Sequence, residues 1–220
     1  MTKHDKSETS GKQLQFWRGE FGDAYIERNA ATSERIVQRT LCFGEILRHL
    51  NGERLRSIVE VGANVGLNLR ALRSLTDAEL WAVEPNGRAR NALVADGVVP
   101  RERVADAAAG DLPFQDGAFD LAFTSTVLIH VAEDAIARAI DELYRVSRRY
   151  ILCIEYFAPV TTEIRYRGHD DLLWKRDYGG LLWDAHADLE LVADGFFWKR
   201  TTGLDNVNWW LFRKPTSTRP

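Results

Sequence analysis

The sequence predicts one α/β domain built on an open, mostly parallel sheet. Between residues 57 and 157, short runs rich in β-branched residues alternate with helical patterns of about ten to fifteen residues. Such alternation is typical of βαβ units, whose parallel sheet carries helices on both faces. Two further strands, 189–199 and 207–213, follow each other closely, and we expect them to pair antiparallel.

Length and composition narrow the class of protein. The chain has 220 residues, 45% hydrophobic and 28% charged, which suits one folded domain and excludes wholesale disorder or a fibre. A net charge of −3 gives no basic footprint for nucleic acid. No apolar run is long enough to span a membrane, and the polar first residues lack a signal-peptide core. With only two cysteines, the sequence predicts a cytoplasmic protein without a disulfide framework.

Each expected element has a local signal. Thr32 or Ser33 caps a helix that runs to Leu50, and Asn51-Gly52 ends it. The expected strands of the sheet are 57–61, 80–83, 103–107, 119–123 and 150–157. The other expected helices are 66–75, 86–95, 132–146 and 178–186. Between 158 and 177 lies a long polar, charged stretch in which we expect neither a helix nor a strand.

These elements divide the chain into consecutive segments. We expect a flexible N-terminus (1–12), a single domain (13–214) and a tail (215–220). Within the domain the expected parts are a helical cap or lid (13–50), a cofactor-binding core (55–156), an insertion on the acceptor side (157–178) and the C-terminal strands (179–214).

The strongest chemical signal is a glycine loop with an acid on the next strand. Gly62 ends the first strand and Gly66 lies where a helix begins, so the backbone there is open to a ligand. Glu84 ends the second strand, where a carboxylate can bind both ribose hydroxyls of a nucleoside. Asp111, after the third strand, can bind an adenine amino group. The set predicts a nucleotide-type cofactor.

Four motifs in this order resemble those of class I S-adenosylmethionine-dependent methyltransferases: VEVGANVG (59–66), AVEPN (82–86), GDLPF (110–114) and TVLIH (126–130). The resemblance implies a Rossmann-like, open, seven-stranded, mostly parallel sheet with helices on both faces and an antiparallel C-terminal strand. Asn64 departs from the pattern, since many members carry glycine there. The segments 16–29 and 165–177 are similar to the methyltransferases associated with pseudaminic acid biosynthesis clusters, which extends the resemblance over almost the whole chain.

The resemblance also implies S-adenosylmethionine as the cofactor and S-adenosylhomocysteine as the product. Glu84 is implied to hold the ribose, and Arg28 or Asn29 the cofactor carboxylate. The residues implied to bind the cofactor are Glu60, Gly62, Ala63, Asn64, Gly66, Asn68, Glu84, Pro85, Asn86, Asp111, Leu112 and Thr126, with Tyr25 and Arg28 from the N-terminal segment.

The acceptor side allows several interpretations. A base is required only where the acceptor must lose a proton, and the candidates are His130, Tyr156 and His169. His130 is equally interpretable as a hydrogen-bonded core residue. The segment 163–177 is either a solvated loop or a substrate lid whose arginines bind a carboxylate or phosphate. The candidate substrate-binding residues are Glu155, Arg165, Tyr166, Arg167, Asp170, Trp174, Trp198 and Trp209. The aromatic residues of 13–29 either pack on the core or cover the cofactor.

The predicted function is methyl transfer to oxygen or nitrogen of a small-molecule acceptor, either a carboxylate-bearing sugar or a natural-product or amino-acid-like metabolite. No metal is expected, because the two cysteines are far apart and the histidines lack ligand spacing. One alternative is an NAD(P)-dependent oxidoreductase, although the loop is G-x-x-x-G rather than G-x-G-x-x-G. Another is a non-catalytic subunit that binds S-adenosylmethionine. We expect a monomer or homodimer, without nucleic-acid or membrane partners.

Overall fold

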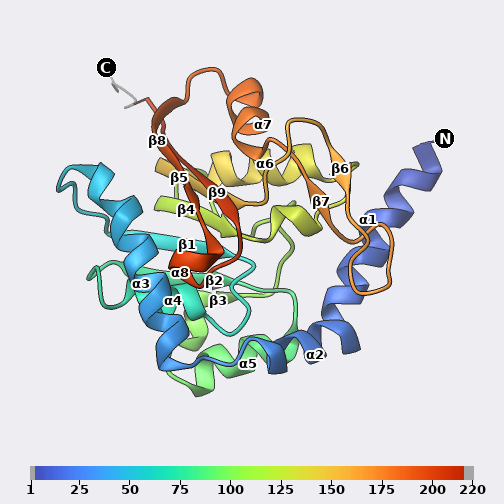
Figure 1. The fold of residues 1–220 in the computed structure, drawn as a ribbon, viewed down its shortest axis with the longest axis horizontal. Helices are drawn as coiled ribbons and strands as arrows, with labels where there is room; N and C mark the ends of the chain where they lie inside the picture. Colours follow the sequence, from blue (N-terminus) through green and yellow to red (C-terminus); the bar gives the residue numbers. More distant parts are fainter. Residues whose placement is uncertain (1–2, 216–220) are drawn as a thin grey trace.

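The computed structural model describes residues 3–215 and places a seven-stranded sheet at the centre of the molecule (Figure 1). Its strands are β1 (Ser57–Val61), β2 (Glu79–Val83), β3 (Val104–Ala105), β4 (Phe119–Ser125), β5 (Ser147–Glu155), β8 (Glu190–Phe197) and β9 (Val207–Arg213). They lie in the order β3-β2-β1-β4-β5-β9-β8. The first five are parallel, and β9 runs antiparallel to both β5 and β8. The predicted fold class is confirmed.

The helices are α1 (Lys3–Arg18), α2 (Glu20–Arg28), α3 (Ser33–Leu47), α4 (Leu67–Leu72), α5 (Gly87–Ala95), α6 (Ile136–Val146), α7 (Tyr178–Ala185) and α8 (Lys199–Thr202). Helix α3 begins as predicted, because the Thr32 side chain accepts the Arg35 N–H. Helix α1 begins at Lys3, so helix extends into the segment predicted as a flexible N-terminus. Apart from Pro215, the predicted tail lies outside the described residues, as do residues 1 and 2.

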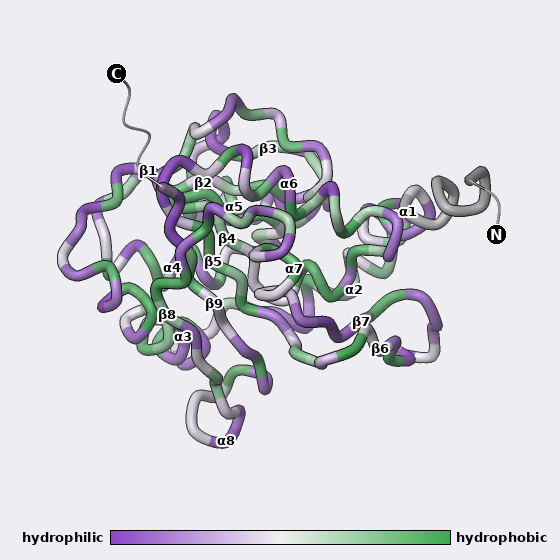
Figure 2. Tube along the Cα trace, turned by 90° about the horizontal axis from the view of Figure 1, so that it is seen from above, coloured by the Kyte–Doolittle hydropathy of each residue, from purple (hydrophilic) through white to green (hydrophobic). Residues whose placement is uncertain are grey.

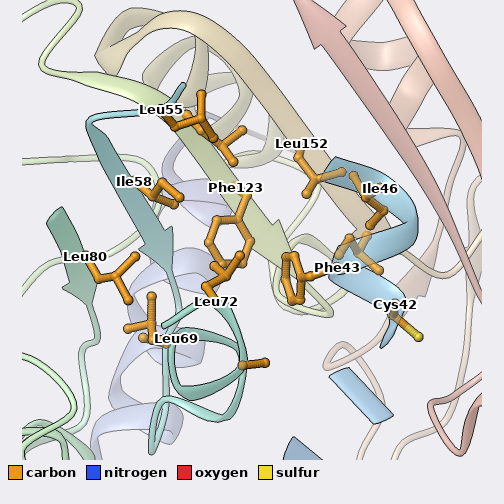
Figure 3. Packing of buried hydrophobic residues seen from close by; sticks show 14 of the residues in the cluster. Cys42, Phe43, Ile46, Leu55, Ile58, Leu69, Leu72, Leu80, Phe123 and Leu152 are labelled. Carbon is orange, nitrogen blue, oxygen red and sulfur yellow. The ribbon is translucent and has the colours of Figure 1, made fainter. Parts of the chain in front are cut away.

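The core has two layers because alternate residues of each strand point to opposite faces of the sheet. On one face Ile58 and Phe123 pack with Phe43 of α3 and Leu69 of α4 (Figure 3). On the other face, side chains of β1, β4 and β5 pack against α6 and α7. Figure 2 shows the corresponding concentration of hydrophobic residues along β4 and β5. Within residues 3–215, no helix is long and apolar enough to cross a membrane.

The charged stretch after β5 forms a small antiparallel hairpin, which the sequence analysis did not expect. Its strands are β6 (Thr162–Glu163) and β7 (Trp174–Lys175). The chain turns at Arg167 and Gly168, which have φ angles of +52° and +86°. The hairpin lies beside α1 (Figure 1), where the rings of Phe16 and His169 are 5.0 Å apart. The insertion is therefore built against the N-terminal helices.

Candidate active site

The loop between β1 and α4 has a conformation that two glycines make possible. Gly62 has a φ of +80°, and a Cβ added there would lie 2.4 Å from Val127 Cγ2. Gly66, the N-cap of α4, has a φ of +74°, and its added Cβ would lie 2.6 Å from Leu93 Cδ2. Backbone conformation and packing both require glycine at these positions. The loop consequently stays tight at the carboxyl end of β1.

Glu84 lies at the carboxyl end of β2, next to this loop. Its carboxylate accepts the N–H of Asn64 at 2.7 Å and the N–H of Asn86 at 2.8 Å. Burial raises the pKa of Glu84, and these two hydrogen bonds oppose that shift. The acid that the sequence analysis assigned to the ribose is thus fixed between the β1 loop and the start of α5.

Asn86 connects the N-terminal helices to the sheet. Its Oδ1 caps α5 by accepting the Ala89 N–H at 3.0 Å. Its Nδ2 donates to the Trp17 carbonyl at 3.1 Å and to Asp23 Oδ1 at 2.9 Å. The side chain that was expected beside the adenine therefore also positions α1 and α2 over the ends of the strands.

Glu60 and Arg39 both line the same cavity, and Arg39 acts electrostatically on Glu60. Glu60, on β1, is 2% exposed; its Oε1 accepts Asn68 Nδ2 at 2.6 Å, and its Oε2 has no hydrogen-bond partner among the described residues. Burial raises the pKa of Glu60 to about 8, against the opposing effects of Asn68 and Arg39. Arg39 was not predicted as a site residue from the sequence. Its signal was an arginine on the apolar stripe of α3, between Ile36 and Phe43.

These groups surround one cavity of about 410 Å³, between the carboxyl ends of the strands and the helices α1 and α2. Carboxyl ends of parallel strands are where open α/β sheets bind ligands. The predicted site residues on its wall are Tyr25, Glu60, Gly62, Ala63, Asn64, Asn68, Glu84, Pro85, Asn86, Asp111, Thr126 and His130. Asn29, the predicted alternative to Arg28, and Trp17 of the predicted aromatic cap also line it; lining residues that the prediction did not include are Arg39, Ala107, Ala108, Ala109, Gly110 and Arg138, among others.

Three predicted cofactor residues do not line the cavity. Leu112 is 4% exposed and packs in the core, because its N–H donates to Glu142 Oε2 at 2.6 Å and draws the backbone toward α6. Gly66 lies behind the loop against Leu93. Arg28 lies over the rings of Phe21 and Tyr25, at 5.6 and 5.5 Å from their centroids.

His130 ends a short 3₁₀ turn after β4 and lines the cavity. Its Nδ1 lies 2.6 Å from the Leu172 carbonyl oxygen. Since a carbonyl only accepts, Nδ1 carries the proton and Nε2 keeps the lone pair. Burial lowers the pKa of His130 to about 4, so the ring is neutral near pH 7. The ring packs against Trp17, with 4.6 Å between centroids.

Glu155 supports the turn that carries Thr126 and His130, rather than lining the cavity as a substrate residue. It is fully buried, and its carboxylate accepts the N–H groups of Val127, Leu128 and Ile129 at 3.2, 3.2 and 3.4 Å. Burial raises the pKa of Glu155 to about 7, although these hydrogen bonds oppose the shift. The Glu155 side chain therefore points under the turn and is not on the cavity wall, where a substrate contact was expected.

The polar tip of the β6–β7 hairpin lies outside the cavity. Arg165 is exposed, with its Nε 3.8 Å from Asp170 Oδ1, and Arg167 is exposed over the Tyr166 ring. His169 is exposed and packs on Phe16, so the structure does not place it as a base at the cavity. Tyr166 comes nearest to the site, with its ring 5.3 Å from that of His130.

Arg176 fastens the base of this hairpin to the loop after β4. It is 2% exposed, and its guanidinium donates to the Val131 carbonyl at 3.1 Å and to Glu133 Oε2 at 3.0 Å. It also stacks over the rings of Trp174 and Tyr178. The insertion therefore has a fixed base next to the turn that carries His130.

The remaining aromatic candidates also lie away from the cavity wall. Tyr156 donates its hydroxyl to Asp205 Oδ2 at 2.8 Å, and burial raises its pKa. Trp174 is buried under Arg176, and Trp209 is buried against Gly195 in the core. Trp198 is 48% exposed at the start of α8. These four side chains make packing or hydrogen-bond contacts with other parts of the protein, and none of them lines the cavity.

Comparison with known proteins shows similarity to a methyltransferase domain and to its fold. Residues 59–150 match the family model of a methyltransferase domain. A Leishmania major SAM-dependent methyltransferase superposes with a TM-score of 0.70 at 15% identity, covering 93% of this chain and 82% of that one. The Burkholderia thailandensis 1,6-didemethyltoxoflavin-N1-methyltransferase, solved with 1,6-didemethyltoxoflavin and S-adenosylhomocysteine, gives 0.68 at 16% identity, covering 97% and 91%. No curated protein sequence matches the chain.

The matched segment is similar to a methyltransferase domain, and the chain shares the fold of solved methyltransferases that use S-adenosylmethionine, the cofactor that these comparisons support. Unpartnered polar atoms in the cavity wall fit that cofactor. Among the described residues, Glu60 Oε2, Asn64 Oδ1 and Trp17 Nε1 are buried without a hydrogen-bond partner. Buried polar atoms are costly unless they are hydrogen-bonded, so a polar ligand is expected at this wall.

Proposed function

We propose that this chain transfers the methyl group of S-adenosylmethionine to an oxygen or nitrogen atom of a small-molecule acceptor. The observation that carries the proposal is the single cavity joining Glu84, the Glu60–Arg39 pair and His130. S-adenosylmethionine supplies an activated methyl group, so the protein has to bind the cofactor and the acceptor, orient them toward each other and exclude water.

The acids and Arg39 account for cofactor binding in this proposal. Glu84 accepts hydrogen bonds from the ribose hydroxyls. Glu60 Oε2 accepts from the ammonium group of the methionine moiety, and Arg39 binds its carboxylate. The unpartnered Glu60 Oε2 and the Arg39 guanidinium both line the cavity and are suited to the ammonium and the carboxylate of an amino acid. The backbone of Ala107–Gly110, with Asp111, lines the wall that we assign to the adenine.

His130 is the proposed base of the acceptor side. The lone pair of Nε2 accepts the proton of an attacking hydroxyl or amine, while the Leu172 carbonyl holds the ring through Nδ1. A neutral imidazole is available down to about pH 4, since burial lowers its pKa to that value. The Trp17 ring beside it limits the orientation of the acceptor.

The size of the site and the net charge of the chain support a small acceptor. The cavity volume of about 410 Å³ falls in the range of small-molecule sites. The net charge of −3 speaks against nucleic acid. The acceptor classes we propose remain a carboxylate-bearing sugar, as the similarity to the pseudaminic acid-associated group implies, or an amino-acid-like metabolite. A cytoplasmic monomer or homodimer remains our prediction.

Methyl-labelled S-adenosylmethionine tests the proposal directly. The purified protein is incubated with labelled cofactor and a cell extract that is separated afterwards into small molecules, protein and nucleic acid. We expect label in the small-molecule fraction, lost in His130→Ala at unchanged cofactor affinity. Label confined to protein or nucleic acid would contradict the proposal. Cofactor binding without any labelled product would favour the non-catalytic subunit.

A further inference from the structure

The side-chain amide of Asn86 is committed to the N-terminal helices. Asn86 is 3% exposed, and its Nδ2 donates to the Trp17 carbonyl at 3.1 Å and to Asp23 Oδ1 at 2.9 Å. A side-chain amide nitrogen carries two hydrogens, so both are used within the protein and neither is free for the cofactor. Buried hydrogen bonds are costly to break, because each group left unpaired keeps its full desolvation penalty. The side chain therefore ties α1 and α2 to the residues that follow β2.

Gly22 of α2 makes this contact close. A Cβ added at Gly22 would overlap the Trp17 carbonyl and lie 2.8 Å from Asn86 Nδ2. Because glycine has no side chain, α2 approaches the end of α1 closely enough for one amide to bind both helices. A larger residue at this position would push the Trp17 carbonyl away from Asn86.

Trp17 connects Asn86 to His130. Its carbonyl binds Asn86, and its ring packs against the imidazole of His130, with 4.6 Å between the centroids. Trp17 and His130 both line the cavity. Burial lowers the pKa of His130 to about 4, and the Trp17 ring supplies part of that burial. A displacement of Trp17 consequently exposes the imidazole to water.

Other contacts of α1 do not replace the hydrogen bond from Asn86. The ion pair of Arg18 with Asp106, at 3.0 Å, joins side chains that are 42% and 49% exposed, and exposed pairs contribute little to stability. Gln13 donates to the Asp171 carbonyl at 2.7 Å, which ties α1 to the β6–β7 hairpin rather than to the central sheet. Asn86 thus provides a buried tie between α1 and the sheet.

The backbone of Asn86 serves the cofactor side instead. Its N–H donates to Glu84 Oε1 at 2.8 Å, which orients the acid proposed for the ribose. We propose that Asn86 is a positioning residue for the acceptor side, whose side-chain amide holds the Trp17 ring against His130 and so keeps the base desolvated and aligned. This inference rests on the proposed function, and it gives Asn86 a role beyond the adenine contact that the family resemblance implies.

Two substitutions remove the tie and preserve the local structure. Asn86→Ser and Asn86→Asp still cap α5 and keep the backbone N–H that orients Glu84, but they lack the amide hydrogens. Arg18→Gln is the matched control, because it breaks an exposed contact of the same helix. Trp17→Ala removes the ring itself, and it is measured alone and together with Asn86→Ser. Melting temperatures check that each variant folds.

NMR spectra of histidine-labelled protein report the protonation of His130, and His130→Gln assigns its signal among the five histidines. In the wild type and in Arg18→Gln we expect no titration midpoint of His130 between pH 5 and pH 8, since burial lowers its pKa to about 4. In both Asn86 variants its pKa should rise to about 5.5 or above, because water reaches the imidazole. Trp17→Ala should raise this pKa as well. Adding Asn86→Ser to Trp17→Ala should change it no further, because Asn86 acts through Trp17.

Binding and turnover complete the test. In calorimetry, Asn86→Ser should bind S-adenosylhomocysteine within about threefold of the wild type, because Glu84, Glu60 and Arg39 are unchanged. At saturating labelled S-adenosylmethionine, its transfer of methyl groups into the small-molecule fraction of the extract should be about tenfold or more slower.

An unchanged His130 pKa in folded Asn86→Ser would overturn the inference, as would a further rise when Asn86→Ser is added to Trp17→Ala. Loss of S-adenosylhomocysteine affinity in parallel with the transfer rate would also overturn it, because the Asn86 side chain would then act on the cofactor. A wild type that transfers no label would refute the proposed function, and the NMR titration would still test the hold of Asn86 on Trp17 and His130.

Discussion

Replacing Glu155 with glutamine should change the stability of the protein in a pH-dependent way. We expect the unfolding free energy of Glu155→Gln, measured relative to that of the wild type, to increase as the pH rises. The Glu155 carboxylate is fully buried under the turn that carries His130. Glutamine has nearly the same shape and keeps a carbonyl oxygen where Oε1 accepts the N–H groups of Val127 and Leu128. It carries no charge, so it imitates the protonated acid.

The size of the effect follows from the raised pKa. Burial moves the pKa of Glu155 from 4.5 to about 7, so the folded state holds a proton that the unfolded state releases. The contribution of Glu155 to the unfolding free energy is fully present below pH 4.5, and it is lost as the pH rises through about 7. A shift of this size corresponds to at most about 3 kcal/mol between pH 4.5 and pH 8.

Urea denaturation of the wild type and of Glu155→Gln at pH 5, 6, 7 and 8 measures this directly. Glu60, Glu84 and the other buried acids are present in both proteins. Their contribution to the pH dependence of stability therefore cancels when the two proteins are compared at each pH. The difference in unfolding free energy should grow in favour of the glutamine variant by about 1–3 kcal/mol from pH 5 to pH 8. A difference that stays constant with pH, or that grows in favour of the wild type, would show that the pKa of Glu155 is not raised in the folded protein.

Three other substitutions test the site. Glu84→Gln should weaken S-adenosylhomocysteine binding about tenfold or more in calorimetry, and unchanged affinity would disprove the ribose role. Gly62→Ala should lose about 2 kcal/mol or more of unfolding free energy, because the added Cβ would lie 2.4 Å from Val127 Cγ2. The control Gly44→Ala in α3 adds its Cβ in open space and should be neutral or stabilising. Equal urea midpoints for the two variants would contradict this. His130→Gln should reduce turnover about 10²-fold. In the wild type, kcat/KM should fall with decreasing pH only near pH 4, where His130 becomes protonated. A fall in kcat/KM already near pH 6.5 would argue against His130 as the base.

The central sheet could be predicted because its signals are local. The first strand, Ser57–Val61, has the predicted bounds, and Asn86 caps α5 where the predicted helix begins. Apolar runs, glycine turns and capping residues lie within a few positions of what they determine. The third strand was predicted over 103–107 but pairs only at Val104 and Ala105, because its length depends on how far β2 extends beside it.

The rest of the site depends on contacts between distant parts of the chain. Glu155 points under the turn of 127–129, and Trp209 packs in the core, although both occupy strand positions that could equally have faced a ligand. Arg39 enters the cavity only because α3 packs across the sheet. The charge pattern of 163–177 allowed either a solvated loop or a substrate lid. Its charged tip is exposed, whereas Tyr166 and the Leu172 carbonyl contact His130. Tertiary packing decides these placements, and no short sequence window contains it.

Titration calorimetry of the wild-type protein with S-adenosylhomocysteine, and separately with NAD, tests the central claim most directly. We expect saturable binding of one S-adenosylhomocysteine per chain and no heat with NAD, because Glu84, Glu60 and Arg39 line a cavity suited to a nucleoside that carries an amino acid. Binding of NAD without binding of S-adenosylhomocysteine would contradict it.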